Sequence, residues 1–440
     1  MHDQKCLNDA ALMLERASSS VAMADLVKDA VNRNQCWRGQ QCINLVAAEA
    51  PSSPTARNLL ASEIGIRASG GGIGRDNRFF TGMALIDEVE SLCVELLKKA
   101  FRCHHADHRL MGGMAGVMAA YTALASPGDS VMTVPIMQGG DSSHRSNGPP
   151  GVRGLEIIDL PFHAGTNDID IDLFKQIATY RKPRVVGIGM TLTLFPIPLE
   201  RIKEIISPWG GKVYFDAAHQ LGLIAAGLFQ DPLREGADLM TGSSGKTFSG
   251  PQGGIIVWDD EELSAAIYRS IFPMLTGSHQ INRVAALAVA TTEIIEYGKT
   301  YMTQVVKNAQ RLGMELKKRG LNVLFHERNF TATHQIVIKS TYLDSAAQEV
   351  RLLESANIIC NKTPLGWGSS KDSPADQSAI RLGTTEITRR GMKEHHMAWI
   401  AERIAEALHH SRSPELIAQD VIEFMKDFRT LYFCHDTATH

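Results

Sequence analysis

The sequence lacks the marks of membrane, secreted and nucleic-acid-binding proteins. No apolar run reaches the roughly 18 to 20 residues needed to span a bilayer. Residues 1–20 carry acidic side chains early and contain no apolar stretch of the kind found in secretory signals. The formal net charge is only −3, so electrostatics gives no reason to expect a nucleic acid or an anionic membrane as a partner. We therefore expect a cytoplasmic protein without membrane or nucleic-acid partners.

Patterns for disulfides and metal ions are also missing. The chain has seven cysteines and no Cys-x-x-Cys pair, so we expect reduced thiols and no disulfide framework. Histidines gather at His104, His105 and His108, but this segment lacks the flanking ligands of a usual metal site. The sequence predicts a polar loop there and no metal.

The length and composition are those of an ordinary globular protein with two domains. The chain has 440 residues, of which 44% are hydrophobic and 21% charged. Residues 1–44 are expected to form a helical arm. In residues 45–300, short apolar runs alternate with amphipathic stretches, which predicts a large, doubly wound α/β domain. Residues 301–440 are expected to form a smaller C-terminal α/β domain.

The alternation can be followed in particular segments. Buried parallel strands are predicted by β-branched runs bounded by Gly, Pro or Asp, at residues 128–136, 184–192 and 212–218. Two separate long helices, 280–298 and 301–320, are expected to lead out of the large domain. Ligands of such sheets bind at the carboxyl ends of the strands.

Two residues near predicted strand ends carry candidate chemistry. Asp216 ends the run KVYFD, where a buried carboxylate is costly unless a cation pairs with it; a helix cap is the alternative. Lys246 lies in the loop GSSGKTFSG, whose small residues let a ligand approach, although a lone loop lysine is usually just solvated. A partly desolvated amine can form a Schiff base, and a carboxylate can keep a pyridine nitrogen protonated. Together, the two residues predict a pyridoxal 5'-phosphate (PLP) site.

Two further motifs fit such a site. Gly112, Gly113, Met114 and Ala115 directly precede a predicted helix, whose free N–H groups suit a phosphate; a plain turn is the alternative. Arg381 follows an apolar residue in a predicted strand and suits a bidentate grip on a substrate carboxylate; a surface arginine is the alternative.

These residues belong to segments that resemble serine hydroxymethyltransferase, of the aspartate-aminotransferase fold type, from about residue 43 to 405. The resemblance is carried by INLVAAEAPSSP, RFFTGMALIDEVE, DAAHQLGLIAAGLF, SSGKTFSGPQGG and IRLGTTEITRRGM. It implies PLP fold type I, with a mostly parallel, seven-stranded type of sheet. It also implies a homodimer, with a tetramer as the alternative, in which the partner chain completes each site.

The resemblance also implies residue roles. Lys246 would be the Schiff-base lysine, Asp216 would bind the pyridinium and Arg381 would grip the amino-acid carboxylate. The other implied cofactor contacts are His219 near the ring oxygen, Gly113 and Met114 at the phosphate, Thr191 near the ring hydroxyl, and Ser244.

Departures from the family gather at one end of the site. A family glutamate lies in a Tyr-Ala-Glu-Gly-Tyr run, where this chain has IRASGGGIGRDNRFF without any glutamate, and Ser69 or a neighbouring glycine stands at the aligned position. The family's paired tyrosines are Phe79 and Phe80, and its ring-stacking histidine falls at Asp141, which we still expect at the cofactor. The residues that the resemblance implies at the cofactor are therefore largely present, whereas those that it implies at the folate and at the hydroxymethyl group are replaced.

We expect a folate-independent aldolase or transaldolase that cleaves or forms the Cα–Cβ bond of a β-hydroxy amino acid. Its partners would be an amino acid and an aldehyde, and the long loop 362–378 leaves room for a large aldehyde. Candidate bases are His144, Glu49 and His219. The alternatives are a tetrahydrofolate-dependent hydroxymethyltransferase acting on serine or 2-methylserine, and a PLP-binding protein without turnover.

Overall fold

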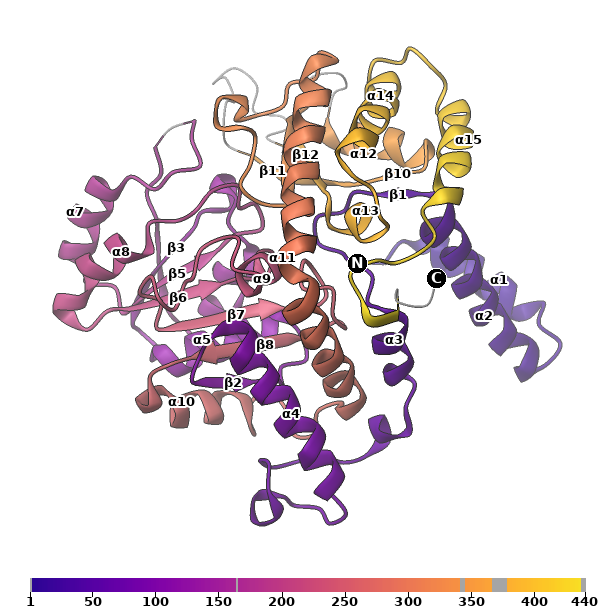
Figure 1. Ribbon diagram of the computed structural model, residues 1–440. Coiled ribbons are helices and arrows are strands. Elements are labelled where there is room, and N and C mark those ends of the chain that lie inside the picture. The colour runs from indigo at the N-terminus through magenta and orange to yellow at the C-terminus, as the bar shows by residue number, and fades with distance from the viewer. Residues whose placement is uncertain (1, 164, 341–344, 366–377, 437–440) are drawn as a thin grey trace.

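A mostly parallel seven-stranded sheet forms the centre of the molecule (Figure 1). The computed structural model describes residues 2–163, 165–340, 345–365 and 378–436. In order across the sheet, the strands are β2 (His105–Asp107), β8 (Gly254–Trp258), β7 (Leu239–Ser243), β6 (Lys212–Asp216), β5 (Val185–Gly189), β3 (Ser130–Thr133) and β4 (Glu156–Asp159). The strands from β7 to β4 run parallel, and β8 runs antiparallel to both β7 and β2. The predicted α/β fold and its three predicted strands are confirmed.

Both faces of the sheet are buried because alternate residues of each strand enter different cores. In β5, Val186 and Ile188 join one core, whereas Val185 joins the other. The first core is closed by α4 (Ala84–Phe101), α7 (Ile171–Arg181), α8 (Leu199–Ile206) and α11 (Ile281–Lys318), and the second by α5 (Gly113–Leu124) and α10 (Glu261–Ile271). Burial on both faces explains why these strands are continuously apolar and do not alternate with polar residues.

One continuous helix, α11, replaces the two helices expected at 280–298 and 301–320. It runs for 38 residues through Gly298 without a break. A Cβ added at Gly298 would lie 3.5 Å from the Cβ of Ala226, so the glycine allows close packing and does not end the helix. An isolated glycine is tolerated within a helix when packing favours it.

The C-terminal residues form a second core around a three-stranded antiparallel sheet. Its strands are β11 (Asn361–Pro364), β12 (Ser378–Gly383) and β9 (Gln335–Lys339), surrounded by α12 (Ala346–Ser355), α14 (Met397–Leu408), α15 (Pro414–Phe424) and the second half of α11. Strand β1 (Ile43–Asn44) joins this core by pairing with β10 (Ile358–Ile359). The domain boundary that we propose at residue 300 therefore falls inside α11. The predicted loop 362–378 lies largely outside the described residues.

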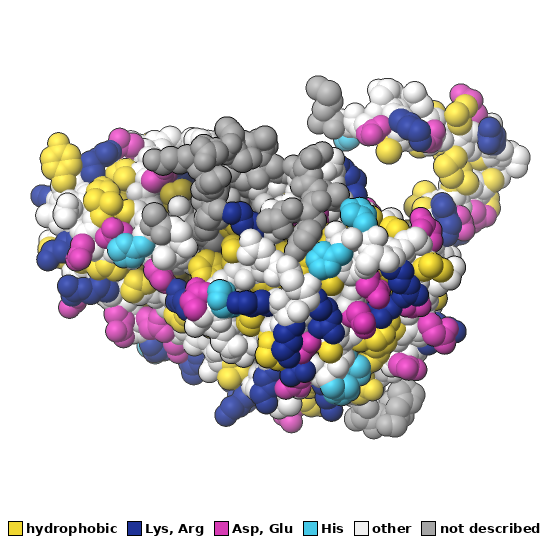
Figure 2. Space-filling view, turned by 90° about the horizontal axis from the view of Figure 1, so that it is seen from above, with side chains coloured by type: hydrophobic (Ala, Val, Ile, Leu, Met, Phe, Trp, Pro, Cys, Tyr) yellow, Lys and Arg dark blue, Asp and Glu magenta, His cyan; other side chains and the backbone are white. Residues whose placement is uncertain are grey.

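The proposed N-terminal arm consists of α1 (Gln4–Glu15) and α2 (Ser20–Cys36), and neither helix contains a buried residue. In Figure 2 the arm stands away from the rest of the molecule. Among the described residues, none of the helices combines the length and the apolar character that a bilayer crossing requires.

A buried ion pair joins α11 to α13 (Thr385–Arg389). Arg389 donates to Glu293 at 2.9 Å, and each side chain is only 1% exposed. We expect Arg389→Met to lower the free energy of unfolding by about 3 to 5 kcal/mol, because it leaves a buried carboxylate unpaired. Asp9→Asn, which breaks the exposed Lys5–Asp9 pair, should cost less than about 1 kcal/mol. Equal unfolding free energies of the two variants in urea titrations would contradict this expectation.

Candidate active site

The candidate site is a cavity at the carboxyl ends of the parallel strands. Six of the residues predicted from the sequence line it: Gly113, Met114, Asp141, Asp216, His219 and Lys246. Asp216 is the last residue of β6, and Lys246 follows three residues after the end of β7. The sheet therefore brings these two residues together, as strand ends in such sheets do.

Lys246 is placed in surroundings that favour its neutral amine. Removal from solvent lowers the pKa of Lys246, although the carboxylates of Asp216 and Asp141 oppose this shift. Its Nζ lies 3.3 Å from Nε2 of His219. Burial also lowers the pKa of His219 well below its usual range, and the nearby charges of Lys246 and Arg381 lower it further. A neutral amine is the form that can attack a carbonyl carbon.

Gln335, the first residue of β9, fixes the tautomer of His219. The Gln335 Oε1 accepts from the Thr193 backbone N–H at 2.9 Å, so its amide nitrogen is the atom 3.2 Å from His219 Nδ1. That nitrogen donates to Nδ1, and the hydrogen of a neutral His219 ring is then on Nε2, facing Lys246. The sequence analysis missed Gln335, because a glutamine within a strand carries no signal for a site.

Asp216 is held from behind by a buried histidine and tyrosine. Its Oδ1 accepts from the Ala218 backbone N–H at 3.0 Å, and its Oδ2 lies 3.2 Å from Nε2 of His144. His144 is fully buried, and its Nδ1 lies 2.9 Å from the Tyr121 hydroxyl. Burial raises the pKa of Tyr121, so its hydroxyl stays protonated and donates to Nδ1. His144 can then donate its Nε2–H to Asp216.

Two glycines in β5 make this arrangement possible. A Cβ at Gly189 would overlap the His144 ring, and a Cβ at Gly187 would overlap the Tyr121 hydroxyl. Gly189 is also the register partner of Asp216 on the neighbouring strand. The glycines in the run VVGIG therefore leave room for the side chains that brace the carboxylate.

The start of α5 forms a second wall of the cavity. Gly113 and Met114 line the cavity, and a Cβ at Gly113 would overlap the Ser243 hydroxyl. The first N–H groups of a helix have no acceptor within the helix, and together with the helix dipole they favour an anion. This wall therefore suits a phosphate group.

Arg381, in the middle of β12, is braced on one edge of its guanidinium group. Its Nη1 donates to both the carbonyl oxygen and the hydroxyl of Thr191. Within the described part of the chain, its Nε and Nη2 make only long contacts, of 3.4 Å, with the Asn361 side chain. Burial lowers the pKa of Arg381 to about 10. The Nε/Nη2 edge has the geometry for a bidentate contact with a carboxylate.

Five expected site residues, Glu49, His144, Thr191, Ser244 and Arg381, are not among the described residues that line the cavity. Glu49 pairs with Arg38 at 2.8 Å, and Ser244 donates to the Pro251 carbonyl oxygen. Thr191 holds Arg381, and His144 uses both ring nitrogens behind Asp216. The geometry therefore favours a positioning role for His144 over that of a base acting on the substrate.

Comparison with known proteins identifies the family of the chain. A sequence profile of the family described as serine hydroxymethyltransferase matches residues 19–404. The chain belongs to the serine hydroxymethyltransferase family. The serine hydroxymethyltransferase of Methanopyrus kandleri is 41% identical, over 92% of this chain and 93% of that protein. That of Methanothermobacter marburgensis is 39% identical, over 96% and 97%.

The fold also recurs in a solved structure. The crystal structure of L-threonine transaldolase from Pseudomonas fluorescens is 24% identical and superposes with a TM-score of 0.87, over 96% of each chain. This likeness confirms the predicted fold type, and the family confirms an enzyme that depends on PLP. The cavity suits this cofactor, because Lys246, Asp216 and the start of α5 could hold its aldehyde, pyridine nitrogen and phosphate, respectively.

The Tyr121 hydroxyl should support cofactor binding through His144. In Tyr121→Phe, His144 Nδ1 loses its donor, which should cost about 1 to 3 kcal/mol of unfolding free energy and weaken PLP binding about 5-fold or more. The matched control is Tyr214→Phe, because the Tyr214 hydroxyl bonds Thr241 at 2.6 Å and not His144. PLP titration followed by fluorescence should separate the two variants. Equal PLP affinities would contradict the role of Tyr121.

His334 predicts a pH dependence of stability. It stacks on His219 and donates to the Ala47 carbonyl oxygen, and burial lowers its pKa from 6.5 to about 3. The unfolded chain takes up this proton below about pH 6.5 and the folded chain does not, so stability is lost as the pH falls from there toward 3. Between about pH 7 and pH 5, this effect should lower the unfolding free energy of the wild type by about 2 kcal/mol. In His334→Gln that part of the decrease should be absent when the unfolding free energy is measured by urea titration. The control is His104→Gln, a change at an exposed histidine, in which the unfolding free energy should depend on pH as in the wild type. The same pH dependence in His334→Gln would refute the expectation.

Proposed function

We propose that this enzyme cleaves or forms the Cα–Cβ bond of a β-hydroxy amino acid without folate, as an aldolase or a transaldolase with a threonine-type donor. One observation carries the proposal. The residues suited to PLP and to a substrate carboxylate are all present, whereas the family's glutamate and paired tyrosine hydroxyls are replaced by Ser69, Phe79 and Phe80.

The surroundings of the replaced residues support this proposal. Ser69 is fully buried, and its hydroxyl donates to the His279 carbonyl oxygen, so it cannot stand in for an acid that contacts substrate. Phe79 is 73% exposed and Phe80 is 46% exposed. Exposed phenylalanines suit a covered interface, and we also propose the homodimer that the resemblance implies. The cytoplasmic location stays a prediction.

The amino acid would be held by charged side chains in and near the cavity. We propose that the Nε/Nη2 edge of Arg381 binds the carboxylate, while Lys246 and Asp216 hold the two ends of the cofactor. When bound, PLP supplies the electron sink that lets a bond to Cα break. Asp216, braced by His144, would hold the proton on the pyridine nitrogen that this role requires.

His219 is the best-placed candidate for moving the hydroxyl proton. Of the three candidate bases, it is the one that lines the cavity; Glu49 is paired with Arg38, and His144 lies behind Asp216. Its lowered pKa keeps the ring neutral, and Lys246 Nζ lies within 3.3 Å. Because its Nε2 already carries the ring hydrogen, His219 would act on the hydroxyl proton through Lys246, by donating Nε2–H to the lysine amine that accepts that proton.

The second candidate is a tetrahydrofolate-dependent hydroxymethyltransferase acting on serine or 2-methylserine. It is favoured by relatives of 36% to 41% identity that are named serine hydroxymethyltransferase. The scaffold is also compatible with the first candidate, because the same fold carries an L-threonine transaldolase.

The decisive experiment supplies L-threonine to the PLP-loaded enzyme without folate and measures acetaldehyde. We expect acetaldehyde, and glycine in matching amount unless a second aldehyde is added as acceptor. Lys246→Ala should abolish the reaction. Arg381→Lys should raise KM by roughly 30-fold or more, since losing a paired contact to a buried charge costs about 2 to 5 kcal/mol. Serine–glycine exchange that requires tetrahydrofolate, with no acetaldehyde from threonine, would favour the second candidate and overturn the first.

A further inference from the structure

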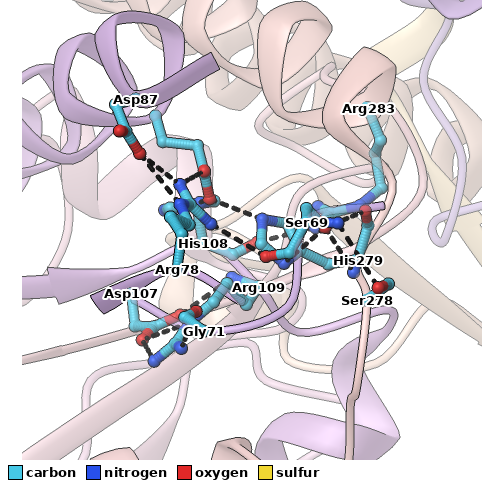
Figure 3. A network of polar contacts seen from close by, with 11 residues as sticks. Ser69, Gly71, Arg78, Asp87, Asp107, His108, Arg109, Ser278, His279 and Arg283 are labelled. Atoms are coloured by element: carbon cyan, nitrogen blue, oxygen red, sulfur yellow. Dashed lines mark hydrogen bonds and ion pairs between the residues drawn. The ribbon is translucent and has the colours of Figure 1, made fainter. Parts of the chain in front are cut away.

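A buried cluster outside the cavity brings together Glu90 of α4, His108 after β2 and His279 before α11. Figure 3 shows His108 and His279 in the surrounding network of polar contacts. The Oε1 atom of Glu90 lies 2.8 Å from Nε2 of His108 and 2.5 Å from Nε2 of His279. One ligand atom from each residue lies within 4.8 Å of the other two, and all three side chains are at most 3% exposed. The cluster is thus preformed and buried.

Ser69 holds His279 in place. Its hydroxyl donates to the His279 carbonyl oxygen at 2.8 Å and accepts from the His279 backbone N–H at 3.0 Å. Ser69 Oγ also lies 3.4 Å from His279 Nδ1, a contact too long to fix the tautomer of the ring. With its hydrogen on Nδ1, a neutral His279 ring turns a lone pair at Nε2 toward Glu90, and this is the form that binds a metal ion.

Two facing lone pairs repel each other unless a cation lies between them. A proton would satisfy the His279 contact alone, whereas a metal ion would bind Glu90, His279 and His108 together. Zinc lies about 2.0 to 2.1 Å from each ligand in a tetrahedral site, so the ligand atoms need to separate by less than about 1 Å. Two imidazoles and a carboxylate are a ligand set that zinc commonly uses.

Neighbouring groups complete the surroundings of such a site. Arg78 pairs with the other oxygen of Glu90, which fixes the carboxylate in place. An adjoining cavity is lined by Glu90 and His108 together with Gly71, Gly72, Arg109 and Tyr268. His108 Nδ1 has no hydrogen-bond partner among the described residues. The cavity can therefore supply a fourth ligand to the ion.

We propose that Glu90, His108 and His279 form a binding site for a divalent transition-metal ion of the zinc type. Three carboxylates and three guanidinium groups already balance around it: Asp87, Glu90, Asp107, Arg78, Arg109 and Arg283. An anionic fourth ligand from the cavity, such as hydroxide, would offset one of the two positive charges of the ion.

The position of the site gives it a structural role. His108 lies four residues before Gly112, which precedes the α5 wall of the active-site cavity. Ser69 ties His279 to the segment that leads to Phe79 and Phe80. A metal ion here would clamp α4, the approach to α5 and the start of α11. The proposal does not rest on the reaction proposed above.

The test is zinc binding by the PLP-loaded enzyme without an affinity tag. After dialysis against zinc and then against metal-free buffer, we expect about one zinc per chain by mass spectrometry of the metal. His108→Gln and His279→Gln should each weaken zinc binding by about 100-fold or more, measured by competition with a coloured chelator. The matched control is His104→Gln, because His104 is an exposed histidine next to the same strand.

Two results would overturn the site. One is zinc that washes out of the wild-type enzyme. The other is a loss of affinity in His104→Gln equal to that in His108→Gln, which would mean binding by surface histidines. A second measurement avoids variants altogether: cobalt(II) bound to the wild-type enzyme should show the intense visible absorption of a tetrahedral site. Cobalt without that absorption would also refute the proposal.

Discussion

The hydrogen-bonded row Tyr121–His144–Asp216 is the constraint on which the active site depends. A carboxylate at the end of a buried strand is stable only if its charge is met by fixed donors, and here a buried imidazole and a backbone N–H supply them. The row exists because the neighbouring strand has Gly187 and Gly189 where any side chain would overlap it. The position of the Asp216 carboxylate therefore depends on glycine at these two residues of the neighbouring strand.

The two cores of the molecule are joined by hydrogen bonds next to the cavity. Arg381 and Gln335 come from the small C-terminal sheet, yet both bind Thr191, and Gln335 also orients His219, which lines the cavity. A movement between the cores would shift Arg381 relative to Lys246. Helix α11 belongs to both cores and limits such movement.

The candidate site agrees with the resemblance in one part and departs from it in another. Lys246 and Asp216, to which the resemblance assigns the cofactor, both line the cavity. Asp141 also lines the cavity, and although burial raises its pKa, hydrogen bonds from Ser143 and nearby positive charges lower it overall. The cavity therefore holds a negatively charged side chain at the residue for which the resemblance implies a stacked histidine.

The sequence by itself determined the sheet and predicted that Asp216 and Lys246 lie close together, because continuous apolar runs bounded by Gly, Pro or Asp identify buried strands, and both residues lie close to strand ends. Only the tertiary structure decided the rest. It joined two expected helices into α11, since packing at Gly298 outweighs glycine's helix propensity. It also placed His144 behind Asp216, and His108 beside Glu90 and His279. Such contacts join residues that are far apart in the sequence, and the spacing of residues along the chain does not indicate which distant segments come into contact.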